Sequence, residues 1–294
     1  MTPLYVIDLN LITLPPLSPL APGLLTIDLD SEQAFGRLIQ IVESDPSLSA
    51  RLIAAANSAA YGLPGQRFVT IEAAASRIGL RRSVQLAVAL LMGNAVNQKL
   101  SASMSQALWL HALTLATAAQ EIARLKKTCD PAQAYFVGLM HDVGYMAMEF
   151  LQPGCLAEIV ARMGRENISV EQAEARTFGA EHPFVAGMLL HDWKLPQEVI
   201  APIEQHHDMD VDPESMAAIL FGAEKIARCE DVVEILYAGL DHPFRPTSMD
   251  RLGIEFLLDQ QLDMSSDAVD RLIERIVDQV EGLREASQAM VANH

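Results

Sequence analysis

The fold is decided by residues 134–145, which read Ala134-Tyr135-Phe136-Val137-Gly138-Leu139-Met140-His141-Asp142-Val143-Gly144-Tyr145. An apolar run leads directly into an imidazole beside a carboxylate. Burying two such polar groups costs free energy unless they are hydrogen-bonded or bind a metal. The His141-Asp142 pair therefore predicts a buried polar site whose partners must come from elsewhere in the chain.

Other histidines lie in or beside apolar segments on both sides of this pair. His111 lies 30 residues before His141, His182 lies 41 residues after it, and His206-His207 follow 24 residues beyond His182. Five of the eight histidines of the chain therefore lie where folding could bring them to one site.

The composition of the 294-residue chain favours an all-α fold. Half of the residues are hydrophobic, only 5% are aromatic, and Ala and Leu dominate. This composition is typical of closely packed helices. Cys129, Cys155 and Cys229 have no paired spacing, which fits a reducing compartment. Met1–Leu11 lacks the basic region of a signal peptide, so we expect a cytoplasmic protein.

The net charge of −17 is concentrated in the last third of the chain. Residues 1–100 carry seven basic and seven acidic residues, residues 101–200 carry seven and 11, and residues 201–294 carry seven and 20. Such a segment repels phosphate backbones and anionic lipids, so we expect neither a nucleic-acid partner nor a membrane partner. The acidic surface is either a solvated face or a site for a basic protein.

Apolar periodicity predicts helices along the whole chain. The predicted ranges are 33–43, 46–56, 70–78, 81–95, 108–125, 131–150, 184–190, 198–207, 214–228 and 266–290. The last helix has one apolar face, formed by Val269, Leu272, Ile273, Ile276, Val277, Val280 and Leu283. We expect this face to pack on the rest of the chain, and the alternative is a docking face for another protein or a second copy.

Short motifs follow one another in order between about residues 13 and 210. They are Leu14-Pro15-Pro16-Leu17, Glu43-Ser44-Asp45-Pro46, Ala56-Asn57-Ser58-Ala59-Ala60-Tyr61-Gly62, Ile78-Gly79-Leu80-Arg81, Leu108-Trp109-Leu110-His111, Gly138-Leu139-Met140-His141-Asp142, Phe178-Gly179-Ala180-Glu181-His182, Trp193-Lys194-Leu195-Pro196 and Ile203-Glu204-Gln205-His206-His207. In this order they resemble the HDOD domain of bacterial signalling proteins, a family related to the HD-superfamily metal-dependent phosphohydrolases.

The resemblance implies an all-helical, two-lobed protein. We expect an N-terminal helical lobe over residues 1–100, an HD-like helical lobe over 101–212 and an acidic helical extension over 213–294 that packs on the HD-like lobe. Most members of the family are regarded as regulatory modules, so the resemblance implies signal transduction through protein–protein contacts.

The resemblance also implies a metal site. Related hydrolases bind one ion through a His, a His-Asp pair and a later Asp, and some bind a second ion through further histidines. The matching positions here are His111, His141, Asp142, His182, His206, His207 and Glu224, the last being a Glu where Asp is expected. Imidazole and carboxylate ligands suit Fe, Mn or Zn. The alternative is a metal-free, hydrogen-bonded polar cluster.

Two departures from active relatives weaken an enzymatic interpretation. Active phosphohydrolases commonly have Lys three residues after the Asp, and this chain has Tyr145 there, a neutral phenol. The sequence after His206-His207 is Asp208-Met209-Asp210, without the Gly-Tyr-Pro motif of relatives that hydrolyse cyclic di-GMP. We therefore expect a regulatory module, and the alternative is a metal-dependent phosphohydrolase acting on a small phosphorylated substrate.

Overall fold

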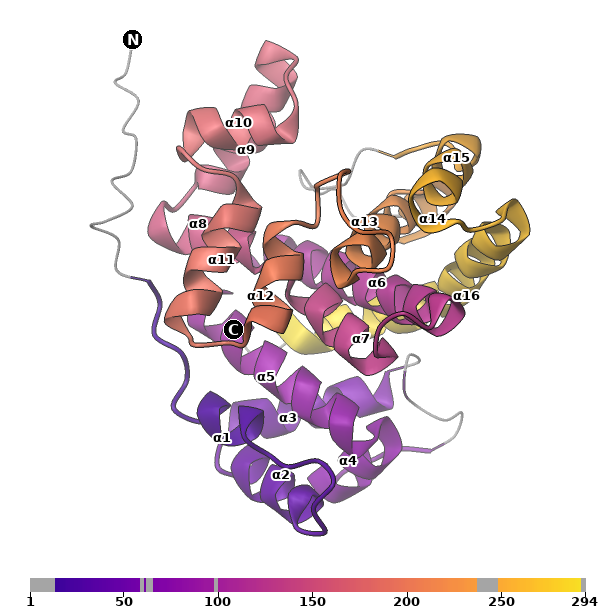
Figure 1. Ribbon diagram of the computed structural model, residues 1–294. Coiled ribbons are helices and arrows are strands. Elements are labelled where there is room, and N and C mark those ends of the chain that lie inside the picture. The colour runs from indigo at the N-terminus through magenta and orange to yellow at the C-terminus, as the bar shows by residue number, and fades with distance from the viewer. Residues whose placement is uncertain (1–13, 59–60, 62–65, 98–99, 237–247, 292–294) are drawn as a thin grey trace.

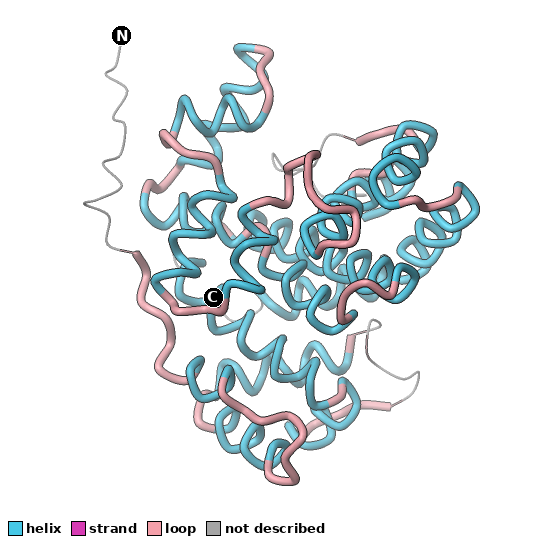
Figure 2. The backbone as a smooth tube through the Cα atoms, in the orientation of Figure 1, coloured by secondary structure: helices cyan, strands magenta, loops and turns pink. Residues whose placement is uncertain are grey.

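The computed structural model describes residues 14–58, 61, 66–97, 100–236 and 248–291, with the backbone alone at 94–97, 235–236, 280–281 and 289–290. Within these ranges the chain forms helices and no strand, which confirms the all-α fold class (Figures 1 and 2). The expectation for Met1–Leu11 falls outside the described residues. No helix in the described ranges has both the length and the apolar composition needed to cross a bilayer.

The first five helices lie in the range predicted as the N-terminal lobe, and we keep that name for them. They are α1 (Ala21–Leu25), α2 (Ala34–Glu43), α3 (Pro46–Asn57), α4 (Ile71–Ile78) and α5 (Leu80–Asn97). Asp45 begins α3, because its Oδ1 accepts hydrogen bonds from the backbone N–H groups of Ser47 and Leu48. Helix α5 continues from this lobe to the next, where it packs on α7 and α8 (Figure 1).

The next seven helices lie in the range predicted as the HD-like lobe, and we call them the second lobe. They are α6 (Ala102–Lys126), α7 (Pro131–Met140), α8 (Val143–Leu151), α9 (Cys155–Glu166), α10 (Val170–Thr177), α11 (His182–Asp192) and α12 (Gln197–Glu204). Helix α6 is buried over most of its length and is the central element, with α7, α13 and α16 packed around it (Figure 1).

The prediction of one continuous helix over residues 131–150 is wrong, because the structure has two helices there. Helix α7 ends at Met140 and α8 begins at Val143, with His141 and Asp142 in the turn between them. The imidazole of His141 caps the end of α7, since its Nδ1 donates to the carbonyl oxygen of Gly138 at 2.7 Å.

Four helices follow the second lobe. They are α13 (Met216–Ala227), α14 (Glu230–Leu236), α15 (Arg251–Leu262) and α16 (Ser266–Val291). The predicted apolar face of α16 is buried at Val269, Leu272, Ile273, Ile276 and Leu283. The side chain of Val280 lies outside the described residues. Helix α16 packs along α6 and also reaches α3 of the N-terminal lobe.

Hydrogen bonds join the two lobes near α7. The hydroxyl groups of Tyr61 and Tyr135 lie 2.6 Å apart, and the guanidinium of Arg82 lies 4.6 Å from the centre of the Tyr135 ring. Trp193 Nε1 donates to the carbonyl oxygen of Pro15 at 2.9 Å, which ties the N-terminal segment to the end of α11. Helix α7, which leads to His141, is therefore held from both lobes.

Candidate metal centre

The turn between α7 and α8 places His141 and Asp142 at the centre of the second lobe. Both residues are buried. A peptide carbonyl cannot donate a hydrogen bond, so the contact with Gly138 puts the ring hydrogen of His141 on Nδ1. In the neutral ring, the form that binds a metal, its Nε2 carries a lone pair that faces Asp142 Oδ2 at 3.1 Å. Two electron-rich atoms then meet inside the protein.

A first group of ligand atoms surrounds this point. His111 comes from α6 and Glu224 from α13, and His111 Nε2 lies 3.1 Å from Glu224 Oε2. His111 Nε2 is also 3.6 Å from Asp142 Oδ2, and His141 Nε2 is 3.9 Å from Glu224 Oε2. The ligand atoms of His111, His141 and Glu224 all lie within 4.8 Å of one another.

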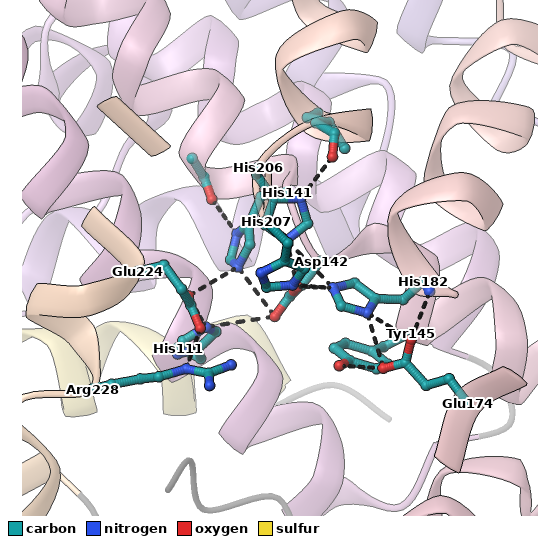
Figure 3. Close-up of polar contacts among 12 residues, drawn as sticks. His111, His141, Asp142, Tyr145, Glu174, His182, His206, His207, Glu224 and Arg228 are labelled. Atoms are coloured by element: carbon teal, nitrogen blue, oxygen red, sulfur yellow. Dashed lines mark hydrogen bonds and ion pairs between the residues drawn. The ribbon is translucent and has the colours of Figure 1, made fainter. Parts of the chain in front are cut away.

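A second group lies on the other side of Asp142. His182 begins α11, and His206 and His207 follow the end of α12. His182 Nε2 lies 3.1 Å from His207 Nε2 and 3.3 Å from His206 Nε2. Asp142 Oδ1 is 3.4 Å from His182 Nε2. The two oxygens of Asp142 therefore face different groups, Oδ2 the first and Oδ1 the second (Figure 3).

The structure thus brings all seven predicted residues to one place (Figure 3). The close contact of α8 and α11 is essential for this arrangement. A Cβ atom added at Gly144 would lie 2.0 Å from the carbonyl oxygen of His182. Only a glycine lets the two backbones approach closely enough to set His182 beside Asp142.

Groups around the ligands hold the imidazole rings with Nε2 facing inward. His206 Nδ1 donates to the carbonyl oxygen of Ile203 at 2.6 Å, as His141 Nδ1 does to Gly138. His182 Nδ1 lies 2.9 Å from Glu174 Oε1. Metal-binding histidines in proteins typically donate the other ring N–H to a carbonyl or carboxylate in this way.

The charges of the cluster follow from burial and proximity. Burial lowers the pKa of His182, but the carboxylates of Glu174 and Asp142 outweigh it and raise that pKa to about 10. Burial and the charge on His182 lower the pKa of His207 to about 4. Burial also lowers the pKa of His206. Without metal, a proton on His182 therefore relieves the repulsion between the three Nε2 atoms.

The carboxylates stay ionised despite their burial. Burial raises the pKa of Asp142, but His141 and His182 hold it well below its usual range. Burial likewise raises the pKa of Glu224, but the positive charges of Arg228 and His111 outweigh burial and hold that pKa well below its usual range. Ionised oxygens and inward-facing imidazole nitrogens are the donors that a divalent cation requires.

One buried nitrogen atom of the cluster shows whether the residues present fit a cation. His141 Nε2 is buried and has no hydrogen-bond partner, although a carboxylate oxygen lies 3.1 Å away. Buried polar atoms are rarely left without a partner. An ion between His141 Nε2 and Asp142 Oδ2 would satisfy both atoms, so the residues present fit a divalent metal.

The sequence did not identify Glu174 as part of this site. It lies on α10 and is fully buried, and its carboxylate accepts hydrogen bonds from the backbone N–H and the ring Nδ1 of His182. Tyr145 donates its hydroxyl hydrogen to Glu174 Oε1 at 2.6 Å and stacks on the His182 ring. The available signal was a carboxylate next to Ala173 and four residues before Phe178, on an otherwise apolar face.

Comparisons with known proteins identify the family of the chain. A model of the HDOD domain matches residues 14–209. An uncharacterized protein from Treponema pallidum (strain Nichols) is 26% identical over 186 residues, which are 62% of this chain. The match covers 35% of that relative, so this chain spans only part of the relative's length.

Solved structures share the fold at low sequence identity. An HDOD domain protein of unknown function from Geobacter sulfurreducens superposes with a TM-score of 0.73 at 21% identity, over 96% of this chain and 94% of that chain. A candidate phosphohydrolase from Shewanella amazonensis SB2B gives 0.70 at 20% identity, over 94% and 95%. A candidate signal transduction protein from Marinobacter aquaeolei VT8 gives 0.69 at 21% identity, over 94% and 60%. The family model covers about two thirds of the sequence, and the chain belongs to the HDOD domain family.

Proposed function

We propose that this chain is a signalling module that acts through protein–protein contacts and binds divalent metal at the cluster around Asp142. Membership of the HDOD family supports the signalling role. The convergence of imidazole Nε2 atoms whose Nδ1 atoms are already hydrogen-bonded carries the metal-binding role.

Two ions can be assigned to the two groups of donors. His111, His141 and Glu224 would hold one, and His182, His206 and His207 would hold the other. Asp142 would serve both groups, since its two oxygens face one group each. Bound divalent ions supply Lewis acidity. The protein's own residues keep the rings oriented and exclude water from the buried donors.

Metal analysis of the purified protein tests this proposal directly. We expect mass spectrometry of the protein to detect up to two ions of Fe, Mn or Zn per chain, and titration calorimetry with Mn²⁺ to give saturable binding. His206→Ala should remove the second ion. His191→Ala is the matched control, because its side chain is 55% exposed and lies outside the cluster.

Thermal unfolding gives an independent measurement of the same binding. An ion at 100 times its dissociation constant should stabilise the native state by about 2.7 kcal/mol. A wild-type protein that binds none of the three metals and shows no shift in unfolding temperature would contradict the proposal and favour the metal-free polar cluster.

A metal-dependent phosphohydrolase is the second candidate function. Its support is that the donors of both groups are present and oriented, including the three histidines of the second group. A panel of phosphatase and phosphodiesterase substrates on Mn-loaded protein separates the two candidates. Turnover that EDTA abolishes and Mn²⁺ restores favours the enzyme, whereas bound metal without turnover favours the binding module.

We predict that cyclic di-GMP is not hydrolysed by the metal-loaded protein. The hydroxyl of Tyr145 is engaged with Glu174, and the acidic segment after His207 opposes a dinucleotide that carries two phosphates. Tyr145→Lys should not create the activity, because that acidic segment remains. Turnover at about 1 per second, measured by chromatography of the products, would contradict the prediction.

A further inference from the structure

Arg228 brings a guanidinium group to the edge of the first group of donors. It lies one helical turn after Glu224, at the end of α13, and its Nε donates to Glu224 Oε1 at 2.5 Å. The other oxygen, Glu224 Oε2, faces His111 Nε2. One carboxylate therefore joins the guanidinium to the cluster.

The far end of this guanidinium is open. In the part of the chain that the structure describes, neither Nη1 nor Nη2 of Arg228 has a hydrogen-bond acceptor, and the side chain is 28% exposed. Figure 3 shows both nitrogen atoms directed away from Glu224, on the side where Tyr145 lies. Arg228 thus offers unused N–H donors next to a cluster of metal-binding character.

The neighbouring polar groups do not use these donors. The Tyr145 hydroxyl donates to Glu174, and no hydrogen bond from Arg228 to its oxygen is present among the described residues. The ammonium group of Lys225, the next cation on α13, lies over the Phe221 ring at 4.3 Å. Arg228, unlike Lys225, is in direct contact with a carboxylate of the cluster.

Charge then limits the kind of ligand. Two divalent ions would add four positive charges, and Arg228 adds one, against the three carboxylates of Asp142, Glu224 and Glu174. With neutral histidines the loaded cluster would carry about two positive charges. A ligand with two negative charges balances it.

Glu171 limits further charge on the ligand. It lies on α10, near enough to Arg228 for the guanidinium to lower the pKa of its carboxyl. Burial raises the pKa of Glu171, but hydrogen bonds from Ser169 and from the backbone of Glu171 outweigh burial, with a further contribution from the charge of Arg228, so the pKa lies below its usual value. A second phosphate reaching this carboxylate would be repelled.

We propose that Arg228 binds the phosphate dianion of a small phosphomonoester, or of inorganic phosphate, at the edge of the cluster; the inference rests on the metal binding proposed above. The planar fork of a guanidinium pairs with two oxygens of a phosphate group. A phosphodiester, with a single negative charge, satisfies this site less well.

Titration calorimetry of the Mn-loaded protein with inorganic phosphate, phenyl phosphate and dimethyl phosphate tests the proposal. We expect the first two to bind and the diester to bind at least about tenfold more weakly. Stronger binding of phenyl phosphate than of inorganic phosphate identifies an ester as the ligand, and the reverse identifies the free ion. Equal binding of the diester would overturn the dianion assignment.

Variants separate two possible roles of Arg228, which are binding phosphate and holding Glu224 in place. Arg228→Gln should weaken phosphate binding by about 10- to 100-fold, the loss expected for hydrogen bonds to a charged group, while Mn²⁺ remains bound at saturating concentration. Lys225→Gln is the matched control, because it removes a neighbouring positive charge without removing the fork. It should leave phosphate binding within about twofold of the wild type.

Three outcomes would overturn or redirect the assignment. Unchanged phosphate binding in Arg228→Gln with Mn²⁺ bound would show that Arg228 only positions Glu224. An equal loss in Lys225→Gln would show general electrostatics instead of a specific contact. A wild type that binds phosphate equally well without Mn²⁺ would contradict the metal-linked form of the site. Failure of wild-type Mn²⁺ binding, measured before any phosphate is added, would instead count against the proposed function itself.

Discussion

Glu174 orients the imidazole of His182 toward the proposed metal site, although Glu174 is not itself a proposed ligand. Its carboxylate accepts the Nδ1 hydrogen of His182, and that contact leaves His182 Nε2 for the cluster. We predict that Glu174→Gln lowers Mn²⁺ affinity by about 10- to 100-fold, as changes to such supporting groups do. Titration calorimetry measures it.

The control for this change is Glu158→Gln. Glu158 is a carboxylate on α9 that is 43% exposed and pairs with Arg165 at the surface. It should leave the affinity unchanged. Equal affinities for all three proteins would show that the orientation of His182 does not depend on Glu174.

The pKa of His182, about 10, predicts two opposite pH dependences. An ion at the second group must displace the His182 proton, so Mn²⁺ affinity should rise by about tenfold per pH unit between pH 7 and pH 9. The metal-free protein should behave oppositely. The folded-state pKa exceeds the unfolded value of about 6.5, so this stability is complete below pH 6.5 and is lost as pH rises towards 10.

Calorimetry across this pH range checks the rise in Mn²⁺ affinity, and thermal unfolding checks the loss of stability of the metal-free protein. His182→Gln should remove the alkaline loss of stability in the metal-free protein, provided that the variant folds. A Mn²⁺ affinity that is constant from pH 7 to pH 9 would mean that His182 is already neutral before the ion binds.

The contact between α8 and α11 is the element on which the second group of donors depends. In Gly144→Ala, a new Cβ would collide with the backbone of His182, so α11 must move. We predict a loss of about 1–3 kcal/mol in the free energy of unfolding and the loss of one of the two ions. Urea denaturation and metal analysis measure these effects.

Gly164→Ala is the matched control for this prediction. Gly164 lies on α9, where an added Cβ meets no atom within 4 Å. The substitution should be neutral or slightly stabilising, since Ala is the better helix former. Two ions bound to Gly144→Ala would show that α11 can shift without disturbing His182.

The C-terminal helix connects regions far apart in the whole molecule. Ile276 is fully buried where α16 packs on the body, and Arg275 pairs with Glu121 of α6 at 2.7 Å. We predict that Ile276→Ala lowers the free energy of unfolding by about 2–5 kcal/mol, as core truncations do. Arg271→Ala, at an exposed position of the same helix, should change it by less than about 0.5 kcal/mol.

Deletion after Asp263 separates the two roles considered for this helix. Packing within one chain predicts a monomer of lower thermal stability. Unchanged stability together with lost self-association, measured by sedimentation, would favour the docking interpretation. Because α6 carries His111, the deletion should also weaken metal binding at the first group.

The sequence predicted the helical class and the site residues by two different routes. Composition and apolar periodicity predicted helices, and the resemblance to a family predicted that His111, His141 and Glu224 meet. Periodicity could not reveal the break at His141, because the apolar run continues through it. Glu174 was missed because its partner, His182, lies eight residues further along the chain at the start of α11, and only the fold brings the two side chains together.

The position of Asp142 between the two groups has a consequence for how such a site decays in evolution. A chain that loses Glu224 or His207 loses one ligand from one group of donors and keeps the other group complete. A chain that loses Asp142 loses an oxygen from each group in a single substitution. Drift away from the proposed metal binding can therefore be gradual at the outer ligands, but at Asp142 it is a single step that affects both proposed ion sites.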